Sequence, residues 1–170
     1  NAGPYKVWTD VYKGRTQTVP LRLMARPTIA KYVRVAEFFD VTKKGLAFFE
    51  DYFSTPYPFK KYDQLLVPNF NWGGMENIAA VTYNERVAKR GQVTKQDREH
   101  LAGLFLHEMA HMWFGDLVTM KWWNDLWLNE AFATFLSYVA QERAMKNPVT
   151  WQSFSLQKMG GYAQDRLATT

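Results

Sequence analysis

Alternating apolar and polar residues mark the first strands of this chain. Residues 18–25 alternate with a two-residue period, which predicts a strand with one buried face. Residues 64–67 form a short apolar run that Pro68 ends, and residues 78–83 form another. Residues 1–27 as a whole are expected to be extended. The first half of the chain therefore predicts a small sheet.

Longer segments carry their apolar residues on one broad side, which is the pattern of helices. We expect helices over residues 40–53, 95–113, 125–146 and 149–160, the last of them ending at a pair of glycines. Because the strands come first and most of the helices follow, the sequence predicts an α+β domain.

Residues that favour helix ends support three of these bounds. Thr94 is a good N-cap, and Asp97 stands three residues later in the capping-box position. Gly115 is expected to stop the same helix. Asn124 or Asp125 is expected to cap the helix that follows.

Composition narrows the class of protein. A chain of 170 residues is long enough for one domain with a buried core. It has no apolar run long enough to cross a bilayer, and its lack of cysteine excludes disulfides and thiolate chemistry. The net charge of +5 comes from basic pairs scattered along the chain, which indicates a solvated surface rather than nucleic-acid binding. The aromatic content of 16% predicts either an unusually aromatic core or a surface that packs against parts outside this chain.

One motif carries the chemistry. His107, Glu108 and His111 form an H-E-x-x-H pattern, and Glu130 follows nineteen residues after the second histidine. Two histidines four residues apart share one helix face, and a glutamate from the next helix can supply a third ligand. Catalytic zinc takes three protein ligands and keeps one position open for water. Glu108 is rotated about 100° from His107, so it can face the open position without binding the metal.

Such a site predicts metal-assisted hydrolysis with one Zn2+ per chain. Zinc lowers the pKa of its bound water toward neutrality and polarises a carbonyl oxygen. Glu108 would take the proton of that water as a general base and pass it to the leaving amine. These properties belong to endopeptidases and exopeptidases alike.

The stretch from Gly73 to Asn77 bears on that choice. Gly73 and Gly74 permit close approach of another chain beside an expected edge strand, to which a peptide could add through main-chain hydrogen bonds. Glu76 could pair with a free α-ammonium group and fix where the substrate begins. The alternative is a tight turn whose glutamate faces solvent.

Three ordered motifs resemble the aminopeptidase N family of zinc metallopeptidases, which are gluzincins with a thermolysin-like catalytic domain. The motifs cover residues 73–77, 107–115 and 127–133, and the resemblance extends from about Pro20 to beyond Trp151. It implies release of an N-terminal amino acid from peptides with a free amino terminus.

The resemblance also implies residue roles. His107, His111 and Glu130 would be the zinc ligands and Glu108 the general base. Glu76 would bind the free amino terminus of the substrate. The backbone at Gly73 and Gly74 would line the peptide.

Several positions depart from the family pattern. Gly74 stands where alanine is most common, Asp116 where asparagine is usual, and Ala131 where glycine is usual. Metal binding is expected to survive these changes. The tyrosine that stabilises the oxyanion in the family would lie beyond Thr170.

We therefore expect a fragment of a larger enzyme whose missing domains are its partners. Residues 1–27 would be an extended lead-in or the end of a preceding β domain, and residues 28–170 a catalytic core truncated at its C-terminal end. Two alternatives remain, a thermolysin-like endopeptidase and a non-catalytic scaffold of the same fold. No nucleic-acid partner and no membrane segment in this chain are expected.

Overall fold

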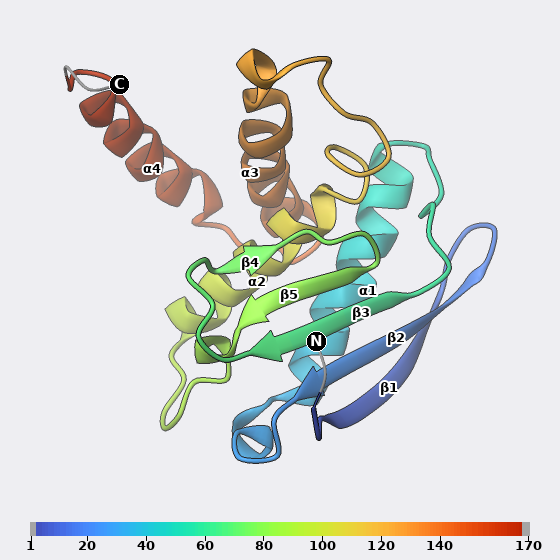
Figure 1. Ribbon diagram of the computed structural model, residues 1–170. Helices are drawn as coiled ribbons and strands as arrows, with labels where there is room; N and C mark the ends of the chain where they lie inside the picture. Colours follow the sequence, from blue (N-terminus) through green and yellow to red (C-terminus); the bar gives the residue numbers. More distant parts are fainter. Residues whose placement is uncertain (1–2, 168–170) are drawn as a thin grey trace.

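The computed structural model describes residues 3–167, which form a five-stranded sheet with helices packed against it (Figure 1). The strand order is β1-β2-β3-β5-β4. The strands are β1 (Lys6–Lys13), β2 (Thr18–Ala25), β3 (Tyr62–Val67), β4 (Gly74–Met75) and β5 (Ala80–Asn84). The neighbouring pairs β2–β3 and β3–β5 are parallel, whereas β1 and β4 pair antiparallel at the two edges.

The alternating pattern placed β2 correctly at both ends. Val19, Leu21 and Leu23 are fully buried, and the residues between them are exposed. The strand expected over residues 78–83 begins later, at Ala80, because the preceding residues form a turn. In that turn Ala79 has a positive φ of 55° and the Ala80 amide donates to the Asn77 carbonyl.

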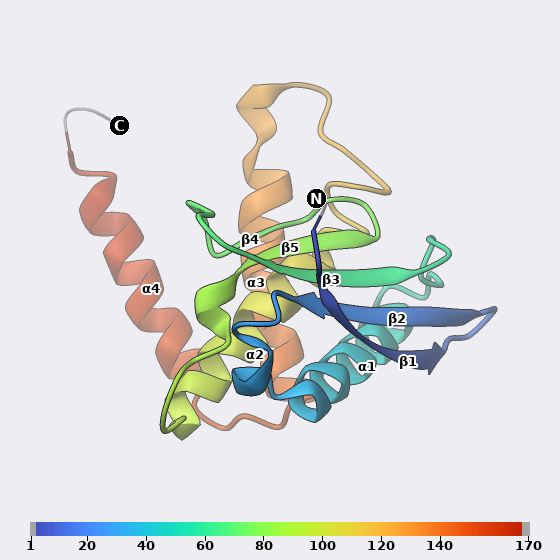
Figure 2. The ribbon, with the colours of Figure 1, turned by 60° about the horizontal axis from the view of Figure 1, so that its bottom comes forward.

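Four helices follow the expected order: α1 (Val35–Tyr52), α2 (Lys95–Ala110), α3 (Trp127–Arg143) and α4 (Thr150–Gln164). Short 3-10 turns cover Ala30–Tyr32, Glu85–Val87 and Trp123–Asp125. Helices α1 and α2 cover one side of the sheet, and α4 projects away from it (Figures 1 and 2). The predicted α+β class is confirmed. Within residues 3–167, none of the helices has the length and apolar character that a membrane crossing requires.

Helix α1 begins about five residues before its predicted start. Its first turns bury Phe38 and Phe39, and the Phe38 ring lies 4.6 Å from the ring of Phe105 in α2. Gly45 allows the same two helices to approach closely, because a Cβ there would lie 2.7 Å from the Met109 sulfur. Burial of aromatic residues therefore extends α1 beyond the segment that periodicity indicates.

The predicted capping box at the start of α2 is confirmed. The Thr94 hydroxyl accepts a hydrogen bond from the Asp97 amide, and the Asp97 carboxylate accepts one from the Thr94 amide. At the other end, α2 stops at Ala110 instead of continuing to residue 113, and His111 is its C-cap.

Two expectations about the later helices were wrong. Leu126 is the N-cap of α3, and Asn124 and Asp125 lie in the preceding 3-10 turn. Helix α4 continues through Gly160 and Gly161. Nothing lies within 4 Å of a Cβ built at either glycine, so both face open space. The helix continues past them to Gln164.

Candidate metal and active site

The two histidines of the motif and Glu130 meet at one point. The His107 Nε2 and His111 Nε2 atoms lie 3.1 Å apart. Glu130 Oε2 lies 3.5 Å from the first and 3.8 Å from the second. Ligand atoms on a tetrahedral zinc are separated by about 3.3 Å, given bonds of about 2.0–2.1 Å. The three residues therefore form a group that can hold a metal ion.

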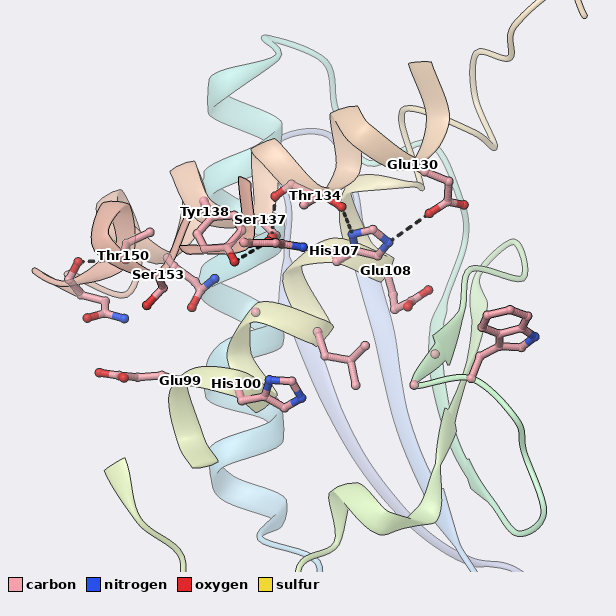
Figure 3. Close-up of a pocket in the computed structure, with 18 of the residues that line it drawn as sticks. Glu99, His100, His107, Glu108, Glu130, Thr134, Ser137, Tyr138, Thr150 and Ser153 are labelled. Atoms are coloured by element: carbon pink, nitrogen blue, oxygen red, sulfur yellow. Dashed lines mark hydrogen bonds and ion pairs between the residues drawn. The ribbon is translucent and has the colours of Figure 1, made fainter. Parts of the chain in front are cut away.

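Two packed helices bring these residues together. His107 lies in the last turn of α2, His111 caps it, and Glu130 lies in the first turn of α3. Figure 3 shows Glu130 reaching from α3 toward His107. His111 is fully buried, whereas half of the Glu130 side chain is exposed. His111 thus lies on the interior side of the site, and Glu130 lies on the side that is open to solvent.

Hydrogen bonds orient both imidazole rings. His111 Nδ1 lies 2.7 Å from the Asn129 side-chain oxygen and 3.0 Å from the Phe114 carbonyl oxygen. Because both partners accept, Nδ1 carries the hydrogen and Nε2 keeps a lone pair for a metal. Thr134 Oγ1 lies 3.3 Å from His107 Nδ1.

Sequence reasoning missed Asn129 and Thr134. Their signal was present, because Asn129 directly precedes Glu130 and Thr134 follows it by one helical turn. Gly115, expected only as a helix stop, has a φ of +132° and lacks the Cβ that would overlap the Asn129 amide. Gly115 therefore permits the contact that orients His111.

Glu108 is buried beneath the triad, with 4% of its surface exposed. Its Oε2 atom has no hydrogen-bond partner among the described residues. A Cβ on Gly74 would overlap its carboxylate, so Glu108 lies directly against strand β4. Burial and the negative charges of Glu76 and Glu130 raise the pKa of Glu108 to about 8. An unpaired carboxylate beside three ligand groups fits a site that receives a cation.

Glu76 lies at the same site from the sheet side. Its Oε1 atom is 3.4 Å from the Asn129 amide nitrogen and 4.0 Å from His111 Nδ1. Only 16% of its side chain is exposed, so it does not point freely into solvent. Gly74 lies in β4, the edge strand of the sheet, and Gly73 directly precedes it; both line the same cavity as Glu76.

A second buried acid lies nearby. Asp116 is the residue noted above as a departure from the family pattern, and its Oδ2 atom has no hydrogen-bond partner within residues 3–167. Burial and the charge of Glu76 raise the pKa of Asp116 to about 7. Its backbone amide donates to the carbonyl of His111, so Asp116 lies next to the C-terminal end of α2.

A cavity of about 800 Å³ contains the site. It extends from β4 along α2 and α3 to α4 (Figure 3). Four glutamates line it, Glu76, Glu99, Glu108 and Glu130, and no lysine or arginine is among its lining residues. The cavity is thus acidic in a chain whose net charge is +5.

Comparison with known proteins agrees with this geometry. The sequence profile of the peptidase family M1 domain matches residues 37–169. The chain belongs to peptidase family M1. The resemblance to the aminopeptidase N family is confirmed by the relatives of this M1 domain.

Aminopeptidase N of Streptomyces lividans is 48% identical over 171 residues, covering 99% of this chain and 20% of the relative. The probable aminopeptidase 2 of Sulfurisphaera tokodaii is 42% identical over 133 residues, covering 77% and 17%. Aminopeptidase M1-B of Oryza sativa is 42% identical over 131 residues, covering 76% and 15%. The M1 domain thus spans about a fifth or less of the length of these curated relatives.

Proposed function

We propose that this M1 domain is the thermolysin-like catalytic core of a zinc aminopeptidase, which hydrolyses the first peptide bond of peptides. One observation carries the proposal: His107, His111 and Glu130 meet at ligand distances, with Glu108 buried beside them and Glu76 at the same cavity. The names of the relatives support the same activity.

His107, His111 and Glu130 would hold zinc, which supplies an acidified water and a polarised substrate carbonyl when it is bound. Glu108 accepts a proton from the attacking water at its carboxylate and donates it to the leaving amine. Its place against Gly74 holds that carboxylate beside any peptide on β4.

Glu76 would select peptides with a free amino terminus. A carboxylate with 16% exposure can form a strong charge-assisted pair with an α-ammonium group. The edge of β4 offers main-chain groups to the first residues of the peptide. Gly73 and Gly74 allow that peptide to lie close to the strand.

Alanine release from tetra-alanine amide tests the activity. We expect release from the peptide with a free amino terminus and none from its acetylated form. Internal cleavage of both forms at similar rates would favour the endopeptidase alternative. The absence of cleavage together with the absence of bound zinc would favour the scaffold.

We also propose that full activity requires residues outside this chain. The chain spans about a fifth of the length of aminopeptidase N of Streptomyces lividans, and the resemblance implies a tyrosine that stabilises the oxyanion. Loss of one oxyanion donor typically lowers turnover about a hundred- to a thousandfold. Comparable turnover of this chain and of the full natural protein on an alanine anilide would refute this. About one zinc per purified chain is expected in either case.

A further inference from the structure

The cavity continues well beyond the residues that the proposed chemistry uses. From His107 it follows α2 toward its N-terminus, where Gly103, His100 and Glu99 line it. The opposite wall comes from α3 and α4, including Gln141, Ser153 and Gln157. Figure 3 shows Glu99 and His100 on one side of this extension and Tyr138, Thr150 and Ser153 on the other.

The geometry of β4 gives the direction of a bound peptide, if Glu76 holds the amino terminus as proposed above. Glu76 lies beside His111, whereas a Cβ on Gly73 would lie 3.3 Å from Leu104 Cδ1. Strand β4 therefore runs alongside α2, with Glu76 at the C-terminal end of that helix. A peptide that begins at Glu76 must run past Leu104 toward Glu99.

Helix geometry indicates which residue of the peptide reaches the extension. Gly103 lies four residues before His107, and Glu99 eight residues before it, which corresponds to about 6 and 12 Å along the helix axis. An extended peptide advances about 3.3 Å per residue. The third or fourth residue of a substrate would therefore lie between Gly103 and Glu99.

Gln141 provides a second observation at this place. It is 8% exposed and lines the cavity, yet its side-chain amide has no hydrogen-bond partner among residues 3–167. Gly103 makes room for it, because a Cβ there would lie 2.9 Å from the Gln141 Nε2 atom. A largely buried side chain that lines a cavity with its amide unpaired favours a polar ligand there, since such groups are normally satisfied.

The negative charge of Glu99 in this part of the cavity favours a cationic ligand. Glu99 is 26% exposed, and its only ion pair in the described part of the chain is a 3.7 Å contact with the largely exposed Lys95. No lysine or arginine lines the cavity to compensate its charge. A cationic side chain could pair with Glu99 and donate to the Gln141 oxygen.

We propose that the space between Glu99 and Gln141 is a subsite for a lysine or arginine side chain at the third or fourth position of the substrate. The subsite would give the aminopeptidase a preference for basic peptides. It rests on the proposed function, because Glu76 defines the direction of the chain.

Alanine release by the full natural protein tests this proposal. The substrates are Ala-Ala-Ala-Ala, Ala-Ala-Lys-Ala and Ala-Ala-Ala-Lys, all amidated. We expect kcat/KM to be about two- to fivefold higher for the better lysine peptide, which is the range of a partly exposed ion pair. The preference should decrease as salt is added.

Glu99→Gln should reduce the lysine preference to about one, and Gln141→Leu should reduce it in part. Glu142→Gln is the matched control, because Glu142 is exposed on α3 and does not line the cavity. It should keep the preference of the unmodified protein. A lysine peptide no faster than tetra-alanine, or an unchanged preference in Glu99→Gln, overturns the proposal.

Binding separates this proposal from the proposed activity. In Glu108→Gln protein, which keeps the metal ligands, the lysine peptide should bind about two- to fivefold more tightly than tetra-alanine amide. Addition of Glu99→Gln should remove that difference. If tetra-alanine is not hydrolysed by the unmodified protein, the proposed function fails, whereas equal binding of both peptides rejects the subsite alone.

Discussion

Helices α2 and α4 line the same cavity but are held in place differently. Helix α2 begins with a capping box and buries Leu101, Phe105 and Met109 between the sheet and its neighbouring helices. In α4, Leu156 is 77% exposed and Met159 64% exposed. The proposed metal ligands thus depend on a helix fixed by the core, whereas the far wall of the cavity depends on a helix with few buried groups.

The contacts that hold α4 explain the difference. The Phe154 ring lies 5.2 Å from the Tyr138 ring, and Tyr138 donates a hydrogen bond to Gln157. These contacts reach only one side of α4. A helix with so little burial opens at lower free energy than the core does. The proposed chemistry and the proposed substrate selection therefore rest on parts of unequal stability.

The largest effect is expected at the buried end of α2. Glu108→Gln should lower kcat for tetra-alanine amide about a hundred- to ten-thousandfold, because the amide cannot accept the proton of the attacking water. Zinc content should stay near that of the unmodified protein. Steady-state kinetics and elemental mass spectrometry check both results, with Glu142→Gln as the control. A loss below tenfold would contradict the role of Glu108 as the base.

Truncation of one side chain in each helix tests whether α2 is more firmly packed than α4. Phe105→Ala should lower the free energy of unfolding by about 3–5 kcal/mol, since Phe105 is 1% exposed and contacts Phe38 and Tyr83. Leu156→Ala on α4 should change it by about 0.5 kcal/mol or less. Urea unfolding measures both. Similar losses would show that α4 is as firmly packed as α2.

The next largest effect is expected on zinc affinity, when the hydrogen bond that orients His111 is removed. Asn129→Ala should weaken zinc binding about ten- to a hundredfold, because the ring then loses the acceptor at 2.7 Å. Competition with a chelator measures the affinity. Asn124→Ala is the control, since Asn124 is exposed in the preceding 3-10 turn. Equal affinities of the two variants would contradict the orienting role.

The smallest effect concerns the sheet and pH. Burial alone would raise the pKa of Asp63, but hydrogen bonds from Arg22 and Lys61 outweigh it and hold the pKa below its usual value. The folded-state pKa is thus below the unfolded value of about 3.9, so this stabilisation is present above pH 4 and is lost as the pH falls further. Asp63→Asn should lower the free energy of unfolding at pH 7 by about 1–2 kcal/mol.

Unfolding by urea at pH 7 and at pH 3 measures this dependence. The difference between the unmodified protein and Asp63→Asn should shrink at pH 3, because the carboxyl group of the unfolded chain, whose pKa is higher, is then largely protonated. Asp40→Asn is the control, because Asp40 forms an exposed pair with Lys44. A constant difference across this range would contradict the assigned pKa shift.

Short-range sequence patterns predicted the features that depend only on neighbouring residues. Strand β2 followed from alternation, and the capping box from Thr94 and Asp97, because both signals lie within one element. The start of α1 was misplaced, since Phe38 is helical and buried through contact with Phe105, sixty-seven residues away. The expected caps at Asn124 and Asp125 failed because the chain forms a separate 3-10 turn there.

Among the residues of the candidate site, some were also predictable from sequence spacing and others depend on tertiary contacts. The spacing of His107, His111 and the later Glu130 predicted a triad, and the structure brings these residues together. The contacts of Asn129 and Thr134 cross between α2 and α3, so they depend on tertiary packing that spacing alone does not give. The proposed subsite likewise depends on Gln141 of α3 lying against Gly103 of α2.

The shortness of β4 has a further consequence. An open sheet edge that accepts one peptide can also accept a strand from another copy of the protein, which leads to aggregation. Strand β4 has only two residues, Gly74 and Met75, and a turn follows it. Such a short edge can align the first residues of a peptide but offers too few hydrogen bonds to extend a sheet between molecules. If β4 binds substrate as proposed, the same two residues combine capture of a peptide with protection of this edge against pairing with another copy.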